Sequence, residues 1–353
     1  MQQPLLMVYG NKRGFFVMRQ GILELLRGAG DRYLSGADIA ERLGVSRTAV
    51  WKHINELKNA GYNIDSQARN GYKLVGAPDR LLPEVISHGL GNKVIGSQIV
   101  AFEDIGSTNN EAKRLAAQGA PDGTVVVAES QNTGKGRLDR SFFCPKGGIW
   151  FSVILKPDFL PQEAPKCTLL AAVAIVEAMH EVGLEAGIKW PNDILYQGRK
   201  LVGILTEMSA EIDRINYVVI GMGINAIIDP TTFPEDIKDK AGSMSMFIGD
   251  FDRVAFFQRV LRRLEANYLD TRRNGFDGVL DRWRKLSVTL GEDINVLGIN
   301  ETFAGRAVDI DTDGALLVQP EGSSEIRKVY AGDVSIRPRK NNLKVGGKYA
   351  FSN

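Results

Sequence analysis

The chain has 353 residues, of which 44% are hydrophobic and 24% are charged, a composition typical of a soluble globular protein with two or three domains. It excludes a disordered chain and a collagen-like repeat, and no apolar run approaches the ~18–20 residues that a membrane span needs. Two cysteines and the lack of a secretory signal favour a reducing, cytoplasmic location. Because 44 basic residues balance 42 acidic ones, a nucleic-acid partner would have to be indicated by a local basic patch.

The N-terminal part has the pattern of a helix–turn–helix. Ser35 is placed to cap one short helix, and Ser46 follows a tight turn and is placed to cap a second. The second helix repeats apolar residues at Val50, Ile54 and Leu57, which is the i, i+4, i+7 spacing of a buried helical face. Together the two caps and this spacing predict a DNA-binding type of helix pair.

A hairpin and a basic surface accompany this pattern. Residues 62–75 predict a β-hairpin that turns at Asn70-Gly71 and would form a wing. From Ser46 to Lys73 there are five basic and two acidic residues, a net charge of +3. We therefore expect DNA binding, although a winged helix that binds protein has the same local pattern. The candidate DNA-binding residues are Ser46, Arg47, Thr48, Trp51, Lys52 and Arg69.

After turn residues at 76–79, which predict a linker, short apolar strands alternate with helical stretches. A helix is expected to begin with a capping box formed by Thr108 and Glu111, and a strongly apolar helix is expected over 165–182. Strands are expected within 94–104, 123–130, 148–157, 189–209 and 215–228. This mixture predicts an α+β domain with a mostly antiparallel mixed sheet.

One glycine pattern suggests a nucleotide site that we reject. Residues 221–226 formally match the G-x-G-x-x-A fingerprint of dinucleotide-binding proteins, which should open a helix. Here Pro230 and Pro234 forbid a regular helix soon after it. The sequence also lacks a phosphate-binding P-loop, so a nucleotide would have to bind by another device.

Two other segments carry chemistry. Residues 131–140 combine glycines, which let backbone N–H groups approach an anion, with positive charge, although a solvated basic hairpin has the same composition. In the segment 189–193, Asn192 and Asp193 present an amide and a carboxylate that suit hydrated Mg²⁺ or a sugar hydroxyl. Lys200 begins the next predicted strand, where an inward ammonium would need an anionic partner.

Taken together, these motifs resemble those of biotin–protein ligases in their order and spacing. The motifs lie at residues 107–109, at 131 together with 134–137, and at 189–193, 198–203 and 221–225. With the N-terminal winged helix, the chain is similar to the bifunctional form of these ligases, which is also the biotin operon repressor. The resemblance covers about residues 17–337.

The resemblance implies adenylation followed by acyl transfer. With ATP and Mg²⁺, biotin would be activated to biotinyl-5′-AMP and then passed to a lysine of the biotin carboxyl carrier domain of a carboxylase. Cations would have to screen the repulsion between the biotin carboxylate and the triphosphate, which agrees with the residue types in the motifs. Polar groups aimed at the ureido ring would reject simple fatty acids, which leave those groups unpaired.

The resemblance also implies individual roles. Biotin would be bound by Ser107, Thr108, Asn109, Gln131, Gly134, Lys135, Arg137 and Lys200. ATP and the adenylate would be bound by Lys135, Arg140, Phe142, Lys189, Asn192, Asn225 and Arg337. Arg137, Lys200 and Asp193 would act in catalysis, with Asp193 also the Mg²⁺ ligand and the base for the acceptor lysine. The chain departs from the family's usual G-R-G-R-x-x-R loop at Lys135, which keeps the charge but loses the bidentate fork, and at the acidic Asp139.

The expected architecture is α+β and multidomain. We expect a winged helix-turn-helix DNA-binding domain at 1–78, a catalytic domain with a mixed sheet at 79–284, and an SH3-like β-barrel with a tail at 285–353. The barrel follows from the short strands after residue 287 and from the family. The resemblance further implies that biotinyl-5′-AMP promotes a homodimer whose paired winged helices bind operator DNA, while the acceptor protein competes for the same sheet edge.

Two alternatives remain open at this stage. A lipoate or octanoate ligase on the same fold is disfavoured by Gln131 and by the segment 189–193. A non-catalytic regulator that only senses biotin is disfavoured because Lys189, Asp193 and Lys200 are all retained.

Overall fold

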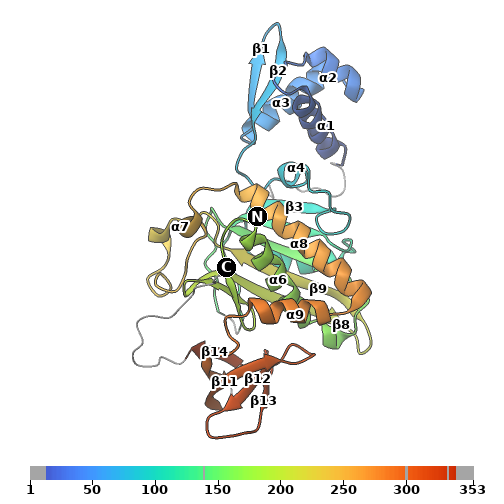
Figure 1. Cartoon of the computed structure of the whole chain (residues 1–353). Helices are drawn as coiled ribbons and strands as arrows, with labels where there is room; N and C mark the ends of the chain where they lie inside the picture. The colour runs from blue at the N-terminus through green and yellow to red at the C-terminus, as the bar shows by residue number, and fades with distance from the viewer. Residues whose placement is uncertain (1–12, 138–139, 299–300, 332–333, 339–353) are drawn as a thin grey trace.

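The computed structural model describes residues 13–137, 140–298, 301–331 and 334–338. Along the chain it forms a helical unit with a two-stranded sheet, a central unit built on a seven-stranded sheet, and a five-stranded sheet. These parts follow one another from top to bottom in Figure 1, so the central sheet lies between the other two.

The N-terminal unit is a winged helix. It consists of α1 (Arg13–Ala29), α2 (Gly36–Leu43), α3 (Arg47–Asn59) and a wing in which β1 (Asn63–Gln67) pairs antiparallel with β2 (Gly71–Gly76). The hydroxyl of Ser35 accepts a hydrogen bond from the backbone N–H of Asp38, and that of Ser46 accepts one from Ala49, so both predicted caps are confirmed. The apolar face predicted for the second helix is buried.

The central sheet has the strand order β3-β4-β5-β9-β8-β7-β6. Only β3 and β4 run parallel, and the other neighbours are antiparallel, which confirms a mostly antiparallel mixed sheet. The strands are β3 (Ile99–Ile105), β4 (Val125–Gln131), β5 (Ile149–Leu155), β6 (Gly187–Lys189), β7 (Asp193–Tyr196), β8 (Arg199–Ala210) and β9 (Ile215–Ile224). The pattern at 221–224 lies inside β9 and opens no helix, so the rejection of a dinucleotide fingerprint is confirmed.

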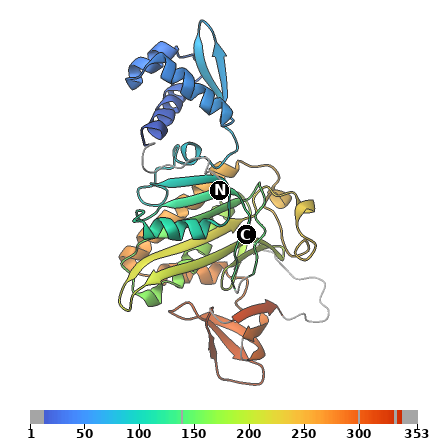
Figure 2. The ribbon, with the colours of Figure 1, turned by 180° about the vertical axis from the view of Figure 1, so that it is seen from behind.

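Helices cover both faces of this sheet. On one face lies α6 (Lys166–His180), with α8 (Arg253–Asn274) and α9 (Asp277–Leu286) packed against it (Figure 1). Because α6 lies between the sheet and these helices, it is buried nearly all round, which explains its continuous apolar sequence. The other face is covered by α5 (Thr108–Ala117), seen in front of the sheet in Figure 2. Short elements elsewhere are η1 (Pro161–Glu163), η2 (Pro230–Thr232) and α7 (Ser245–Ile248).

The predicted start of α5 was wrong by one residue. The N-cap is Ser107, whose hydroxyl accepts a hydrogen bond from the backbone N–H of Asn110, and Thr108 is the first helical residue. Serine and threonine are both good caps, so local sequence does not separate them. Tertiary contacts decide, because the Thr108 side chain is engaged by a buried hydroxyl of β5.

Buried charges join the winged helix to the central unit. The Arg19 guanidinium of α1 lies 2.5 Å from the Glu84 carboxylate of α4 (Pro83–Ile86), and both side chains are almost fully buried. Within the central unit, Arg253 pairs with Asp79 of the linker and with Glu129 of β4. Since a buried charge is tolerated only when it is paired, these contacts hold the linker against the central sheet.

The C-terminal unit is an antiparallel sheet of order β13-β12-β11-β10-β14. Its strands are β10 (Asp293–Gly298), β11 (Thr302–Ile310), β12 (Leu316–Pro320), β13 (Arg327–Val329) and β14 (Val334–Pro338). A turn at Asp313-Gly314 joins β11 to β12. Among the described residues no pairing joins the two edge strands into a closed barrel, so the SH3-like barrel stays a prediction.

Candidate active site

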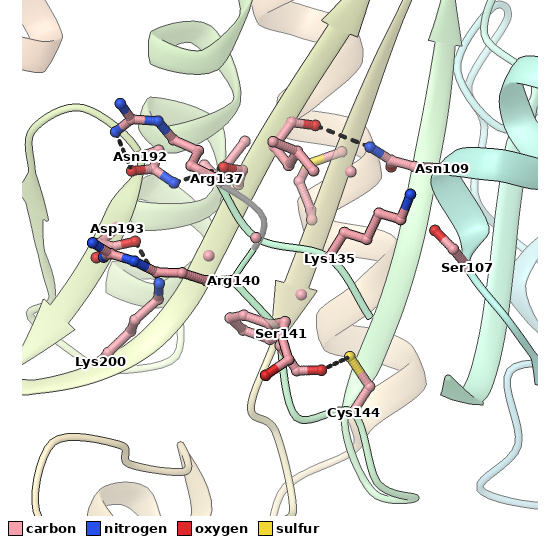
Figure 3. Close-up of a pocket in the computed structure, with 18 of the residues that line it drawn as sticks. Ser107, Asn109, Lys135, Arg137, Arg140, Ser141, Cys144, Asn192, Asp193 and Lys200 are labelled. Atoms are coloured by element: carbon pink, nitrogen blue, oxygen red, sulfur yellow. Dashed lines mark hydrogen bonds and ion pairs between the residues drawn. The ribbon is translucent and has the colours of Figure 1, made fainter. Parts of the chain in front are cut away.

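A cavity of about 170 Å³ lies where the loop after β4 crosses β8 and β9. Its walls come from the β3–α5 junction, the segments 135–137 and 140–144, the β6–β7 turn and the strands β8 and β9 (Figure 3). Segments that are distant in sequence therefore meet at one place, and each of them carries one of the motifs identified from the sequence.

At one end of the cavity, hydrogen bonds fix the orientation of polar groups. The backbone N–H of Thr108 donates to Gln131 Oε1 at 2.7 Å, and Gln131 Nε2 donates to Cys144 Sγ at 3.3 Å. Ser107 is held by its role as the cap of α5. These groups are mostly buried, so they are arranged before any ligand arrives, as a selective polar site requires.

Asn109 is held at this end by residues that the sequence did not single out. Its Nδ2 donates to the Glu207 carboxylate at 2.8 Å and to the carbonyl oxygen of Leu205 at 3.3 Å, while its Oδ1 lies 2.6 Å from the Ser152 hydroxyl. Lys113 pairs with the same carboxylate at 2.6 Å. Burial raises the pKa of Glu207, but the hydrogen bonds from Lys113 and Asn109 outweigh it, and the net shift is downward, so Glu207 is ionised.

Three glycines of β8 and β9 leave space for these side chains. A Cβ at Gly221 would lie 2.1 Å from Asn109 Oδ1. A Cβ at Gly203 or at Gly223 would lie 2.7 or 2.8 Å from the ring of Phe142. Gly221 and Gly223, which belong to the apparent nucleotide fingerprint, are therefore explained by side chains that pack directly against the strand backbone.

The other end of the cavity is cationic. Lys200 Nζ lies 2.6 Å from Asp193 Oδ1 and 5.3 Å from the centre of the Phe142 ring. Arg137 Nη1 donates to Asn192 Oδ1 at 3.3 Å. Burial lowers the pKa of Arg137, and the charge of Asp193 opposes that shift. Figure 3 shows these side chains converging from separate segments.

The balance of charge in the cavity is strongly positive. In the described part of the chain one carboxylate, that of Asp193, lines the cavity, against five cationic side chains, a net charge of +4. The cations are Lys135, Arg137, Arg140, Lys189 and Lys200. Such a field suits two anions that must approach each other. Within the described ranges no cluster of three or more His, Cys, Asp or Glu side chains could hold a metal by itself.

Most residues predicted from the sequence to bind biotin or ATP line this cavity, including Phe142, but among those whose side chains are described Gly134 and Asn225 do not. Asn225 is buried and donates to the carbonyl oxygen of Gly242 at 2.9 Å, so it holds backbone next to the start of β8. Gly134 is absent from the lining, and Arg337 lies in the C-terminal strand β14. Asp139 lies outside the described residues. The contacts of all the predicted site residues with biotin or ATP stay predictions.

The six candidate DNA-binding residues are all exposed. Trp51 has 60% of its surface exposed although it is a large apolar side chain, whereas Val50 and Ile54 beside it are buried. An exposed aromatic among basic and polar groups on α3 indicates a binding face. None of the described helices is long and apolar enough to cross a membrane.

Comparison with known sequences identifies three families along the chain. Residues 101–225 match the biotin/lipoate A/B protein ligase family, residues 19–73 match an HTH domain, and residues 289–337 match the biotin protein ligase C-terminal domain. The match at 289–337 shows that the C-terminal sheet is of the ligase type.

Relatives extend over nearly the whole chain. The bifunctional ligase/repressor BirA of Bacillus subtilis is 41% identical over 322 residues, covering 90% of this chain and 98% of the relative, and that of Escherichia coli is 28% identical. A solved structure of the biotin protein ligase of Aquifex aeolicus in complex with biotin and ATP matches with a TM-score of 0.60 and 28% identity, covering 69% of this chain and 100% of the other. Given the cavity, the exposed winged helix and these relatives, the chain belongs to the family of bifunctional biotin protein ligases that are also repressors.

Proposed function

We propose that the cavity joins biotin to ATP to form biotinyl-5′-AMP and then transfers biotin to a lysine of a biotin carboxyl carrier domain. This proposal rests on how the cavity is lined. Arg137, Lys189 and Lys200 converge on it, and its opposite end presents Ser107, Thr108 and Gln131. This arrangement would hold the ureido ring at the polar end and bring the carboxylate to the cations. The Aquifex structure, which holds biotin and ATP, supports both ligands.

Lys200 is the residue that we assign to the reacting anions. Its ammonium already pairs with Asp193, so an incoming biotin carboxylate or α-phosphate would compete with that side chain for it. Exchange of partners would free Asp193 at the moment when the adenylate forms. The freed carboxylate is the candidate base for the acceptor lysine, which must lose a proton before it attacks.

Mg²⁺ fits this site only together with the phosphates of ATP. Magnesium commonly takes one or two carboxylates and completes its ligands with water and phosphate oxygens. Asp193 supplies one carboxylate, next to the amide of Asn192, which suits an ion carried in on the nucleotide. When bound, the ion would add positive charge at the triphosphate.

The C-terminal unit is proposed to brace the cationic end, and we retain the prediction that it folds as an SH3-like barrel. Trp190 lies beside Lys189, and its backbone N–H donates to Thr289 Oγ1 at 2.9 Å. Its indole N–H donates to the carbonyl oxygen of Gly314 at 3.2 Å, in the turn between β11 and β12. These bonds connect the C-terminal sheet to the segment that carries Asn192 and Asp193.

The decisive test of the ligase proposal is incorporation of biotin. Incubation with ATP, biotin and a biotin carboxyl carrier domain should produce a band on a streptavidin blot. Exchange of labelled pyrophosphate into ATP should depend on biotin and should not be supported by lipoate. Exchange with lipoate but not with biotin would overturn the assignment.

For the repressor activity, we propose that biotinyl-5′-AMP promotes a homodimer whose two winged helices bind operator half-sites. The exposed residues of α3 and the relatives named ligase/repressor support this proposal. In a gel-shift titration, biotin plus ATP should raise operator affinity, and sedimentation should show a dimer under the same conditions. Affinity that does not change on adding both ligands would reject the switch.

A further inference from the structure

We propose that Ser152, a buried residue of β5 that does not line the cavity, fixes Thr108 as a hydrogen-bond acceptor and thereby selects a ligand ring with an N–H at that position. The inference rests on the proposed function, since biotin is the ring that we place there. It assigns a positioning role to a residue that neither the sequence motifs nor the cavity itself reveals.

The argument starts from Asn109, because its amide can point only one way. One face of the amide meets the Glu207 carboxylate and the Leu205 carbonyl oxygen, which accept hydrogen bonds and cannot donate them. The NH₂ group must therefore occupy that side, and Lys113 keeps Glu207 ionised. The amide oxygen is left facing Ser152, so Asn109 Oδ1 is a fixed acceptor.

This fixed acceptor determines where the Ser152 proton lies. The Ser152 oxygen is 2.6 Å from Asn109 Oδ1 and 2.8 Å from Thr108 Oγ1, and a hydroxyl has one proton to give. Asn109 Oδ1 cannot donate, so the shorter contact must use the Ser152 proton. The contact with Thr108 then requires the proton of Thr108, which points at Ser152 and away from the cavity.

Thr108 consequently offers only lone pairs to a ligand. The neighbouring side chains of Gln131 and Ser107 instead offer hydrogen-bond donors. Gln131 Oε1 is occupied by the backbone N–H of Thr108, so the Gln131 side chain presents its NH₂ group. The Ser107 oxygen accepts a backbone N–H, which leaves its proton to be donated.

The polar end thus presents two donors and one acceptor in a fixed arrangement. A cyclic urea has the complementary pattern, with a carbonyl oxygen for the donors and a ring N–H for the acceptor. A ring that places oxygen instead of N–H opposite Thr108 would set lone pair against lone pair at a buried hydroxyl. Sites built in this way reject a ligand that lacks one donor far more strongly than a hydrophobic site rejects a change in size.

The experiment uses two cyclic carbamate analogues of biotin, in each of which oxygen replaces one of the two ring N–H groups. Binding to the full-length protein is measured by calorimetry without ATP, so the result does not depend on catalysis. The wild type should bind one analogue roughly a hundredfold more weakly than biotin, because a buried acceptor loses its partner. In Ser152→Ala the Thr108 hydroxyl is free to turn and donate, so this discrimination should fall to roughly tenfold or less.

Two further variants separate this role from a general effect on folding. Thr168→Val removes a hydroxyl pair of the same 2.8 Å length, Thr168 with Thr206, outside the cavity, and should leave the ratio between ligands unchanged. Thr108→Val removes the acceptor and should abolish the discrimination even if its folding stability is normal. If biotin and the analogue weaken by the same factor in Ser152→Ala, the inference is overturned although the ligase proposal stands. If biotin itself fails to bind the wild type, the proposed function fails first.

Discussion

Replacing Lys200 with alanine tests the proposed chemistry most directly. Two unit charges about 4 Å apart at an effective dielectric constant of 20 interact by about 4 kcal/mol. The four other cations of the cavity would compensate in part, so we expect a loss of about 2–4 kcal/mol in the transition state for adenylation. That corresponds to a rate roughly 30-fold to 10³-fold lower.

Folding should be affected much less. The Lys200 and Asp193 side chains are 33% and 25% exposed, and a partly exposed ion pair contributes at most about 1 kcal/mol. The assay is exchange of labelled pyrophosphate into ATP at saturating biotin, with a thermal melt of the same sample. Lys146→Ala is the matched control, because Lys146 forms an ion pair with Glu103 outside the cavity and should retain normal exchange. An exchange rate for Lys200→Ala within threefold of the wild type would refute the role that we assign.

Three other predictions concern packing, buried charge and the cysteines. Gly221→Ala should weaken biotin binding at least tenfold by calorimetry, because the new Cβ would displace Asn109; unchanged affinity would contradict the packing. Arg253→Met should lower the free energy of unfolding in urea by about 3–5 kcal/mol, because Glu129 would be left buried and unpaired, and a loss below 1 kcal/mol would count against it. Burial raises the pKa of Cys144 and Cys167 to about 12, so Ellman's reagent at pH 8 should react slowly with the folded protein and rapidly with both thiols in denaturant. Since the unfolded thiols ionise near 9, stability should be full below pH 9 and fall as the pH rises toward 12, which a series of melting curves would show.

The sequence predicted well those features that depend on near neighbours. Ser35 and Ser46 cap their helices through backbone groups three residues away, and the i, i+4, i+7 spacing fixes which face of α3 is buried. The cationic residues could be found because they occur in recognisable motifs. These signals depend only on nearby residues, so they can be recognised without knowing the fold.

Other parts of the site could not be read in this way. Ser152 is a single small polar residue in an otherwise apolar strand, and Glu207 lies in a strand of mixed polarity, so neither pattern by itself indicates a site. Their importance depends on strands that pair far apart in sequence and bring both side chains to Asn109. The cap of α5 was misplaced for the same reason, because a residue of β5 engages Thr108. Long-range register, which no local pattern encodes, decides these positions.

The buried pair of Arg19 and Glu84 limits how the protein can be shortened. A chain trimmed to begin at residue 79 would keep the acid but discard both its guanidinium partner and the helix α1 that packs against α4. The face of α4 that α1 covers would then meet solvent, so the fragment should unfold at a lower temperature than the full chain. The winged helix therefore adds to the stability of the central unit through this contact.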